Sequence, residues 1–189
     1  MSHFEGGSII LCDFLVNIND PLIACFIGHK KIKDEKLVYE RVLKIVEELV
    51  ADDVKYFIFG SKSSFNTLCY KVVSELRDKK YPFIKRVFAN CDHHVYPEVY
   101  QRLIDSMYEY SYFSQKVKNA GGNKYIFRNQ DMIDKSDVVI FYYDESYKKD
   151  IMTTKNRRLS FVQKSGTGMA FEYAKKNNKK IINIFNLIC

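Results

Sequence analysis

The stretch PLIACFIGHKKIKDEKLVYERVLKIVEELVADDVKYFIFG, residues 21–60, decides the fold class of this chain. Its first apolar run, residues 22–27, ends at a glycine and is typical of a strand buried on both faces. Asp34 can cap the helix that follows, in which apolar residues recur at helical spacing over residues 38–49. The second apolar run, residues 56–59, also ends at a glycine, so the stretch predicts a strand–helix–strand unit.

The same alternation of strands and helices continues to the C-terminus. We therefore expect an α/β fold, a Rossmann-like, doubly wound and mostly parallel sheet with helices on both faces. In such sheets, ligands bind outside the carboxyl ends of the strands, near the point where the strand order reverses. Further strands are predicted at 84–89, 124–127, 138–142 and 180–185, and further helices at 68–76, 96–107, 129–135 and 166–178.

The length of 189 residues fits one domain with a short appendage. The dipeptide Asp20-Pro21 is a turn signal, so we expect an N-terminal appendage over residues 1–20 and a single domain over 21–189. Residues 144–164 form a polar and basic stretch without any period. A loop of this length in a compact domain is usually functional or mobile, and we expect a long basic insertion there.

The composition, 47% hydrophobic and 28% charged, is that of a globular protein and excludes a disordered or collagen-like chain. No run approaches ~18 apolar residues, and residues 8–18 lack a preceding basic region, so we expect neither a transmembrane helix nor a signal peptide. A cytoplasmic location follows by default. The five cysteines include no CxxC pair and are expected to be reduced core residues, with a disulfide framework as the alternative.

The net charge of +7, from 30 basic and 23 acidic residues, suits anionic partners such as phosphates or nucleic acid. Such an excess is also common in lysine-rich bacterial proteins that bind neither. The charge alone therefore does not choose a partner.

The segment KSGTGMAFEYA, residues 164–174, is the strongest local signal for a ligand site. It is a short glycine turn that opens a predicted helix, where free N–H groups and the helix dipole favour phosphate. The spacing matches neither a Walker A loop nor GxGxxG, so simple turn formation stays open as the alternative. The predicted phosphate contacts are Ser165, Gly166, Thr167 and Gly168.

Arg128 is the second signal, because it is predicted to lie where a strand gives way to a helix at the ligand edge, with Asn129 beside it. Its planar guanidinium suits a phosphate or a carboxylate in a bidentate arrangement. The alternative is a surface ion pair with Asp131 or Asp134.

Other candidates follow the predicted strands at the same edge. For the glycines and Ser61, the alternatives to a ligand contact are turn formation and helix capping. For the tyrosines, the alternative is the general abundance of tyrosine in this chain. His93 and His94 follow Cys91 and Asp92, but adjacent histidines point in different directions, so we expect a polar loop, with a metal site of Cys91, Asp92 and His93 as the alternative. The candidates are Gly28, His29, Gly60 and Ser61 for a phosphate or base, and Tyr142, Tyr143 and Asp144 for a base or ribose.

Three of these segments occur in an order and spacing that resemble the sequence pattern of the SLOG superfamily. They are Arg128 with Met132, residues 136–141 and the turn at 165–167. This Rossmann-like group includes the Lonely Guy phosphoribohydrolases and the DNA-processing protein A family. In the Lonely Guy enzymes, an Arg-Lys-x-x-Met helix start precedes a Ser/Ala-Asp-apolar strand that leads to a Gly-Gly-x-Gly-Thr phosphate turn. The resemblance covers about residues 22–186 and implies a Rossmann-like fold with a nucleotide-type ligand.

The opening residues 25–30, Cys-Phe-Ile-Gly-His-Lys, look like the start of the YpsA-like bacterial branch, in which a strand ends in Gly-His-Arg. Residues 59–65 fall where that branch carries its second glycine-containing turn. The resemblance therefore points to this branch within the superfamily.

Departures from the pattern bear on catalysis. The phosphoribohydrolases follow Gly-Thr with an acidic pair that serves cleavage of the N-glycosidic bond, and the matching positions here are Met169 and Ala170. Neither side chain can accept a proton or stabilise an oxocarbenium ion. Glu172 comes two residues later, about 200° further round a helix. The resemblance thus implies the fold and the ligand class without the hydrolase reaction.

We therefore expect a sensor or regulatory module that binds a nucleoside monophosphate or an ADP-ribose-like ligand and requires no cofactor. One alternative is a phosphoribohydrolase-like nucleotide N-glycosidase, with Glu172, Asp144 or Glu145 as its carboxylate. Another is nucleic-acid binding, although no helix-turn-helix or RNA-recognition signature is present. The superfamily resemblance implies a homo-oligomer, a dimer in the simplest case, and no membrane partner is expected.

Overall fold

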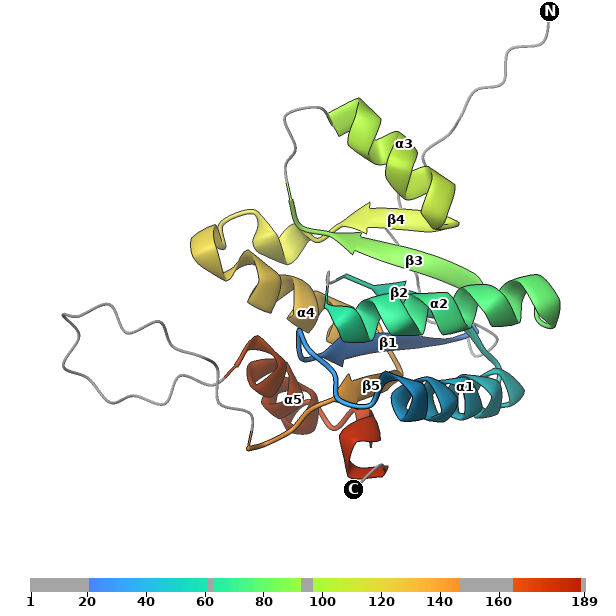
Figure 1. Cartoon of the computed structure of the whole chain (residues 1–189). Helices are drawn as coiled ribbons and strands as arrows, with labels where there is room; N and C mark the ends of the chain where they lie inside the picture. The colour runs from blue at the N-terminus through green and yellow to red at the C-terminus, as the bar shows by residue number, and fades with distance from the viewer. Residues whose placement is uncertain (1–20, 61–62, 93–96, 147–164, 188–189) are drawn as a thin grey trace, which may run out of the picture.

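The computed structural model describes residues 21–60, 63–92, 97–146 and 165–187. They form an α/β structure with one six-stranded, all-parallel sheet, which confirms the predicted fold class (Figure 1). The strands are β1 (Leu22–Gly28), β2 (Val54–Phe59), β3 (Lys85–Asn90), β4 (Tyr110–Phe113), β5 (Val138–Tyr142) and β6 (Lys180–Asn183). The α-helices are α1 (Glu35–Ala51), α2 (Ser64–Lys79), α3 (Pro97–Met107), α4 (Lys124–Asp134) and α5 (Gly166–Lys176).

The strand order in the sheet is β4-β3-β2-β1-β5-β6. The chain steps outward from β1 to β4 and then crosses back to β5, so the order reverses between β1 and β5. Right-handed crossovers place α1, α2 and α3 on one face of the sheet and α4 and α5 on the other. Figure 1 shows α1 beside α2, and α4 beside α5, in the two resulting layers.

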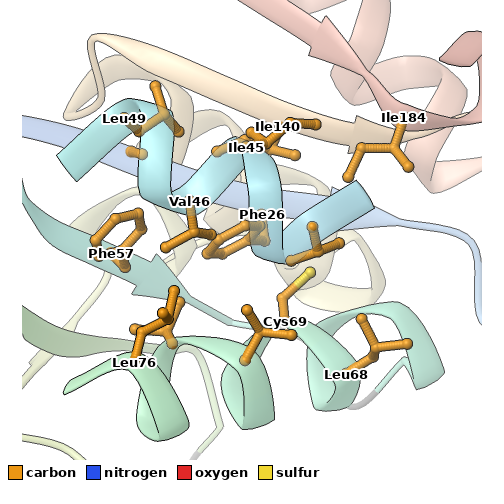
Figure 2. Close-up of a cluster of buried hydrophobic side chains, with 14 of the residues drawn as sticks. Phe26, Ile45, Val46, Leu49, Phe57, Leu68, Cys69, Leu76, Ile140 and Ile184 are labelled. Carbon is orange, nitrogen blue, oxygen red and sulfur yellow. The ribbon is translucent and has the colours of Figure 1, made fainter. Parts of the chain in front are cut away.

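The central strand β1 is buried on both faces, as predicted. Ala24 and Phe26 belong to the core beneath α1 and α2, whereas Cys25 and Ile27 belong to the core beneath α4 and α5. This division follows from the period of two along a strand. Figure 2 shows side chains of α1 and α2 converging on Phe26 from the same side of the sheet.

Two helix starts depend on short polar side chains. Asp34 caps α1, as predicted, because its Oδ1 accepts the N–H of Leu37 at 3.1 Å. Ser63 caps α2 in the same way and accepts the N–H of Asn66 at 3.2 Å. Both caps lie at the carboxyl edge of the sheet, where the helices begin.

One prediction of secondary structure is wrong, and one strand was not predicted. Residues 124–127, expected as a strand, are the first turn of α4, and the sixth strand is β4, in a region that carried no clear pattern. The helical period of α4 is hidden in the sequence because two of its buried positions are the charged residues Arg128 and Asp131. β4 is an edge strand of four half-buried residues and has no apolar run. The last strand also ends earlier than expected, at Asn183, where a 3₁₀ turn follows.

Cys25, Cys69 and Cys91 are free and buried, as expected. The predicted appendage over 1–20 and most of the predicted insertion, residues 147–164, lie outside the described residues. No helix in the described part of the chain is long and apolar enough to span a membrane.

Candidate ligand-binding edge of the sheet

The reversal of strand order brings the carboxyl ends of β1 and β5 together. Gly28, the last residue of β1, stands opposite Tyr142, the last residue of β5. The next residue, His29, donates its backbone N–H to the carbonyl oxygen of Tyr142 at 3.2 Å. In doubly wound sheets this is the position of the ligand crevice.

His29 is buried and braces the chain that leaves β5. Its Nε2 lies 3.0 Å from the backbone nitrogen of Asp144 and 3.3 Å from its carbonyl oxygen, so it accepts the N–H in one tautomer and donates to the carbonyl oxygen in the other. Burial lowers the pKa of His29 below its ordinary value, against an opposing effect of Asp144. The sequence prediction places His29 on the ligand, whereas this geometry gives it a structural bond within the edge.

Arg128 is the most unusual residue at this edge because its charged side chain is only 3% exposed. Its Nη1 donates to the carbonyl oxygen of Gly60 and to Cys91 Sγ at 3.6 Å, and its Nη2 donates to Asn129 Oδ1 at 2.8 Å. Its Nε has no acceptor among the described residues. Burial lowers the pKa of Arg128, although a guanidinium stays charged at neutral pH.

No described carboxylate forms an ion pair with Arg128. The alternative of a surface ion pair with Asp131 or Asp134 is therefore wrong. Asp131 pairs with Lys135 at 3.2 Å, and Asp134 pairs with Lys116. The guanidinium is thus a buried cation whose described hydrogen-bond acceptors are all neutral.

Two candidate glycines are required by packing. A Cβ on Gly60 would lie 2.6 Å from Met132 Sδ and 2.8 Å from Arg128 Nε. A Cβ on Gly28 would lie 2.3–2.8 Å from atoms of Phe65. Neither glycine has a positive φ, so both owe their place to the close approach of a side chain.

The predicted phosphate turn begins α5. Ser165 is its N-cap, and Ser165 Oγ accepts the N–H of Gly168 at 3.0 Å. No described group accepts the N–H of Gly166 or of Thr167, as is usual in the first turn of a helix. A Cβ on Gly168 would lie 3.4 Å from the ring of Tyr143, so the turn lies against the chain that leaves β5. The predicted turn is therefore present and adjoins the switch point.

Tyr142 lies in the core. Its ring packs against Phe65 and Phe185, at 5.7 and 5.6 Å between centroids, and its hydroxyl accepts the N–H of Lys33 at 3.0 Å. It is 2% exposed and presents no ring face at the edge.

Tyr143 and Asp144 follow β5, and Asp144 is buried. The Tyr143 ring packs on Phe171 at 4.7 Å and is half-buried. Asp144 Oδ1 accepts both the N–H and the hydroxyl of Ser146, at 2.9 and 2.6 Å. Asp144 is therefore oriented by its own loop.

Sequence reasoning missed an aromatic residue at this edge, Tyr125 on the first turn of α4. Its ring is 50% exposed, its hydroxyl donates to Asp92 Oδ1 at 3.3 Å, and Arg128 Cζ lies 5.5 Å from its centroid. Lys124 Nζ also contacts Asp92 Oδ1, at 2.5 Å. The spacing of three residues between Tyr125 and Arg128 would have indicated this neighbour had the helix been predicted from residue 124.

The lysines differ between the two edges of the sheet. Lys30, Lys31 and Lys33 follow β1 at the carboxyl edge, are exposed, and form no ion pair with a described residue. At the amino edge three lysines are paired with carboxylates. These pairs are Lys55 with Asp53, Lys80 with Glu47 and Lys180 with Asp52.

Some candidates lie outside the described residues, namely Ser61, His93 and His94. Among the residues that are described, no group of three His, Cys, Asp or Glu side chains could hold a metal ion.

No protein-family model matches this chain, and no curated protein matches it. The resemblance to the SLOG superfamily stays a prediction that rests on the motifs in the sequence.

Proposed function

We propose that this protein binds a nucleotide or a nucleotide derivative across the carboxyl edge of β2, β1 and β5, and that it acts as a sensor or regulatory module. Binding would change the loops that Arg128 and His29 hold together and pass this change to a partner. The resemblance to the SLOG superfamily points the same way.

The observation that carries the proposal is the burial of Arg128 without a described carboxylate partner. A buried charge without an ion-pair partner is destabilising, so an anion that pairs with Arg128 would stabilise the folded protein. Arginine binds phosphate well because its guanidinium offers several parallel donors. The neutral partners Gly60 and Asn129 hold the group in place without neutralising it.

The dimensions of the edge fit a ligand larger than inorganic phosphate. Arg128 contacts the end of β2, and the α5 turn lies against the end of β5. β1 lies between these two strands, which puts them two strand spacings apart, or roughly 10 Å. A nucleotide is long enough to contact both anchors at once.

The hydrolase alternative receives no support from α5. The two positions that match the acidic pair of the phosphoribohydrolases carry no carboxylate. They are Met169, which is 38% exposed, and Ala170, which is buried. Glu172 is exposed and lies two residues after Ala170, about 200° further round the helix. We therefore propose binding without cleavage of the glycosidic bond.

Thermal unfolding with AMP, GMP, CMP, ADP-ribose, NAD and ribose 5-phosphate tests the proposal. A ligand at 100 times its Kd stabilises the folded state by about 2.7 kcal/mol and should raise the midpoint by several degrees. Arg128→Met should abolish the rise, whereas Arg41→Met, which removes the same charge from an exposed site on α1, should retain it.

Each variant is compared with its own midpoint without ligand, and Arg128→Lys serves as a second variant that keeps the charge and loses the planar fork. A panel that leaves the wild-type midpoint unmoved at millimolar concentration would overturn the proposal. Release of free base from AMP by the same sample would move the assignment to the N-glycosidase.

A further inference from the structure

We propose that Tyr125 is the platform on which the planar base of the nucleotide stacks. This inference rests on the proposed function and deepens it, because it assigns the part of the ligand that distinguishes a nucleotide from a sugar phosphate. It is carried by the exposure of the Tyr125 ring, the contacts that fix it and its position beside Arg128.

Tyr125 lies in the first turn of α4 and is 50% exposed, so its ring is not packed into the core. Its hydroxyl is fixed by Asp92 Oδ1, which Lys124 Nζ contacts from the same helix turn. The backbone of Asp92 is fixed in turn, because its N–H donates to Asn90 Oδ1 at 3.0 Å. A ring held in place before binding loses little side-chain entropy when a ligand stacks on it.

Tyr125 and the anion-binding group form one unit. The guanidinium carbon of Arg128 lies 5.5 Å from the centroid of the ring, which is within the range of a cation–π contact. A base on Tyr125 would therefore lie next to the buried charge that we assign to the anion. Aromatic rings and guanidinium planes are the surfaces on which proteins stack unpaired bases.

The two tyrosines that the sequence indicated for this role are engaged elsewhere. Tyr142 is packed in the core, and the Tyr143 ring contacts Phe171. Tyr125 is the most exposed of these three tyrosines. Among the described residues, Tyr125 is also the one aromatic residue that forms a cation–π contact with Arg128. We therefore assign the base to the start of α4 and not to the end of β5.

The test compares AMP with ribose 5-phosphate by isothermal titration calorimetry on the full-length protein. Wild type should bind AMP more tightly than ribose 5-phosphate, because only AMP carries a base. Tyr125→Ala should weaken AMP about tenfold or more and leave ribose 5-phosphate unchanged, since stacking on one aromatic side chain has an effect of this size. Tyr125→Phe, which keeps the ring, should retain most of the affinity.

Phe83→Ala is the matched control, because Phe83 is 47% exposed but precedes β3 at the opposite edge of the sheet. Its affinity for AMP should equal that of wild type. Equal binding of AMP by wild type and Tyr125→Ala would overturn the inference and leave the proposed function standing. Failure of wild type to bind either compound would overturn both. The midpoint of thermal unfolding, measured for each variant, shows that the folded protein is being compared.

Discussion

Arg128 on α4 donates a hydrogen bond from Nη1 to the carbonyl oxygen of Gly60, which directly follows β2. The two residues are 68 positions apart in the chain. The contact brings the guanidinium to the carboxyl end of a central strand, where no described carboxylate lies within ion-pair distance of it. The absence of a side chain at position 60 makes the approach possible, because Arg128 Nε occupies the space next to the backbone.

Gly60→Ala should therefore destabilise the folded protein. The added Cβ would lie 2.6 Å from Met132 Sδ and 2.8 Å from Arg128 Nε, so both side chains must move. Overpacking of this kind costs about 1–3 kcal/mol. Urea denaturation should show this loss as a lower midpoint with an unchanged slope.

Gly166→Ala is the control for this prediction. A Cβ at Gly166 would meet no atom within 4 Å, and the residue begins α5, so the free energy of unfolding should be unchanged or rise by up to about 1 kcal/mol. Equal midpoints for the two alanine variants would contradict the tight packing of Arg128 on Gly60.

The pH dependence of stability should report His29. Its Nε2 accepts the Asp144 N–H only when the ring is neutral, and burial lowers the pKa of His29 below 6.5. Because the unfolded chain then takes up the proton at a higher pH than the folded one, the folded state loses stability as the pH falls below about 6.5. The slope from this group is at most about 1.4 kcal/mol per pH unit.

His29→Gln cannot titrate, so its free energy of unfolding should fall less steeply than that of wild type between pH 7 and the folded pKa. Urea denaturation at several pH values gives both profiles, and their difference isolates His29 from every other titrating group. Parallel profiles would show that the ring is not held neutral by this bond.

The fold was predictable from the sequence where apolar residues mark the period. β1 and β5 are continuous apolar runs that the sheet buries on both faces, and their glycine or tyrosine ends mark the carboxyl edge. The turn at Ser165 was equally visible, because a serine cap followed by glycines has a local signature.

The environment of Arg128 could not be predicted in the same way. The burial of Arg128 depends on Gly60 and Cys91, which follow β2 and β3. The absence of an ion pair between Arg128 and Asp131 depends on the contact of Asp131 with Lys135. Such contacts are set by the packing of α4 on the sheet rather than by spacing along the chain. For the same reason the sequence indicated Tyr142 and not Tyr125. The sequence shows that Tyr142 ends a strand, but it does not show that the core covers the Tyr142 ring.

The exposed lysines after β1 should increase the affinity for an anionic ligand. Lys30, Lys31 and Lys33 form no ion pair with a described residue, and they follow the strand that ends at the switch point. The triple variant K30Q/K31Q/K33Q should bind AMP several-fold more weakly at 50 mM salt, and the difference should shrink at 0.5 M as the Debye length shortens.

The control K55Q/K80Q/K180Q removes the same charge from the amino edge, where each lysine is paired with a carboxylate. If only net charge mattered, both triple variants would lose affinity equally. If the field at the carboxyl edge attracts the ligand, only the first variant loses affinity, because the second lies across the sheet and beyond the Debye length of about 14 Å at 50 mM salt. Calorimetric titration with AMP at the two salt concentrations separates these outcomes, and equal losses would contradict a directed field at the ligand edge.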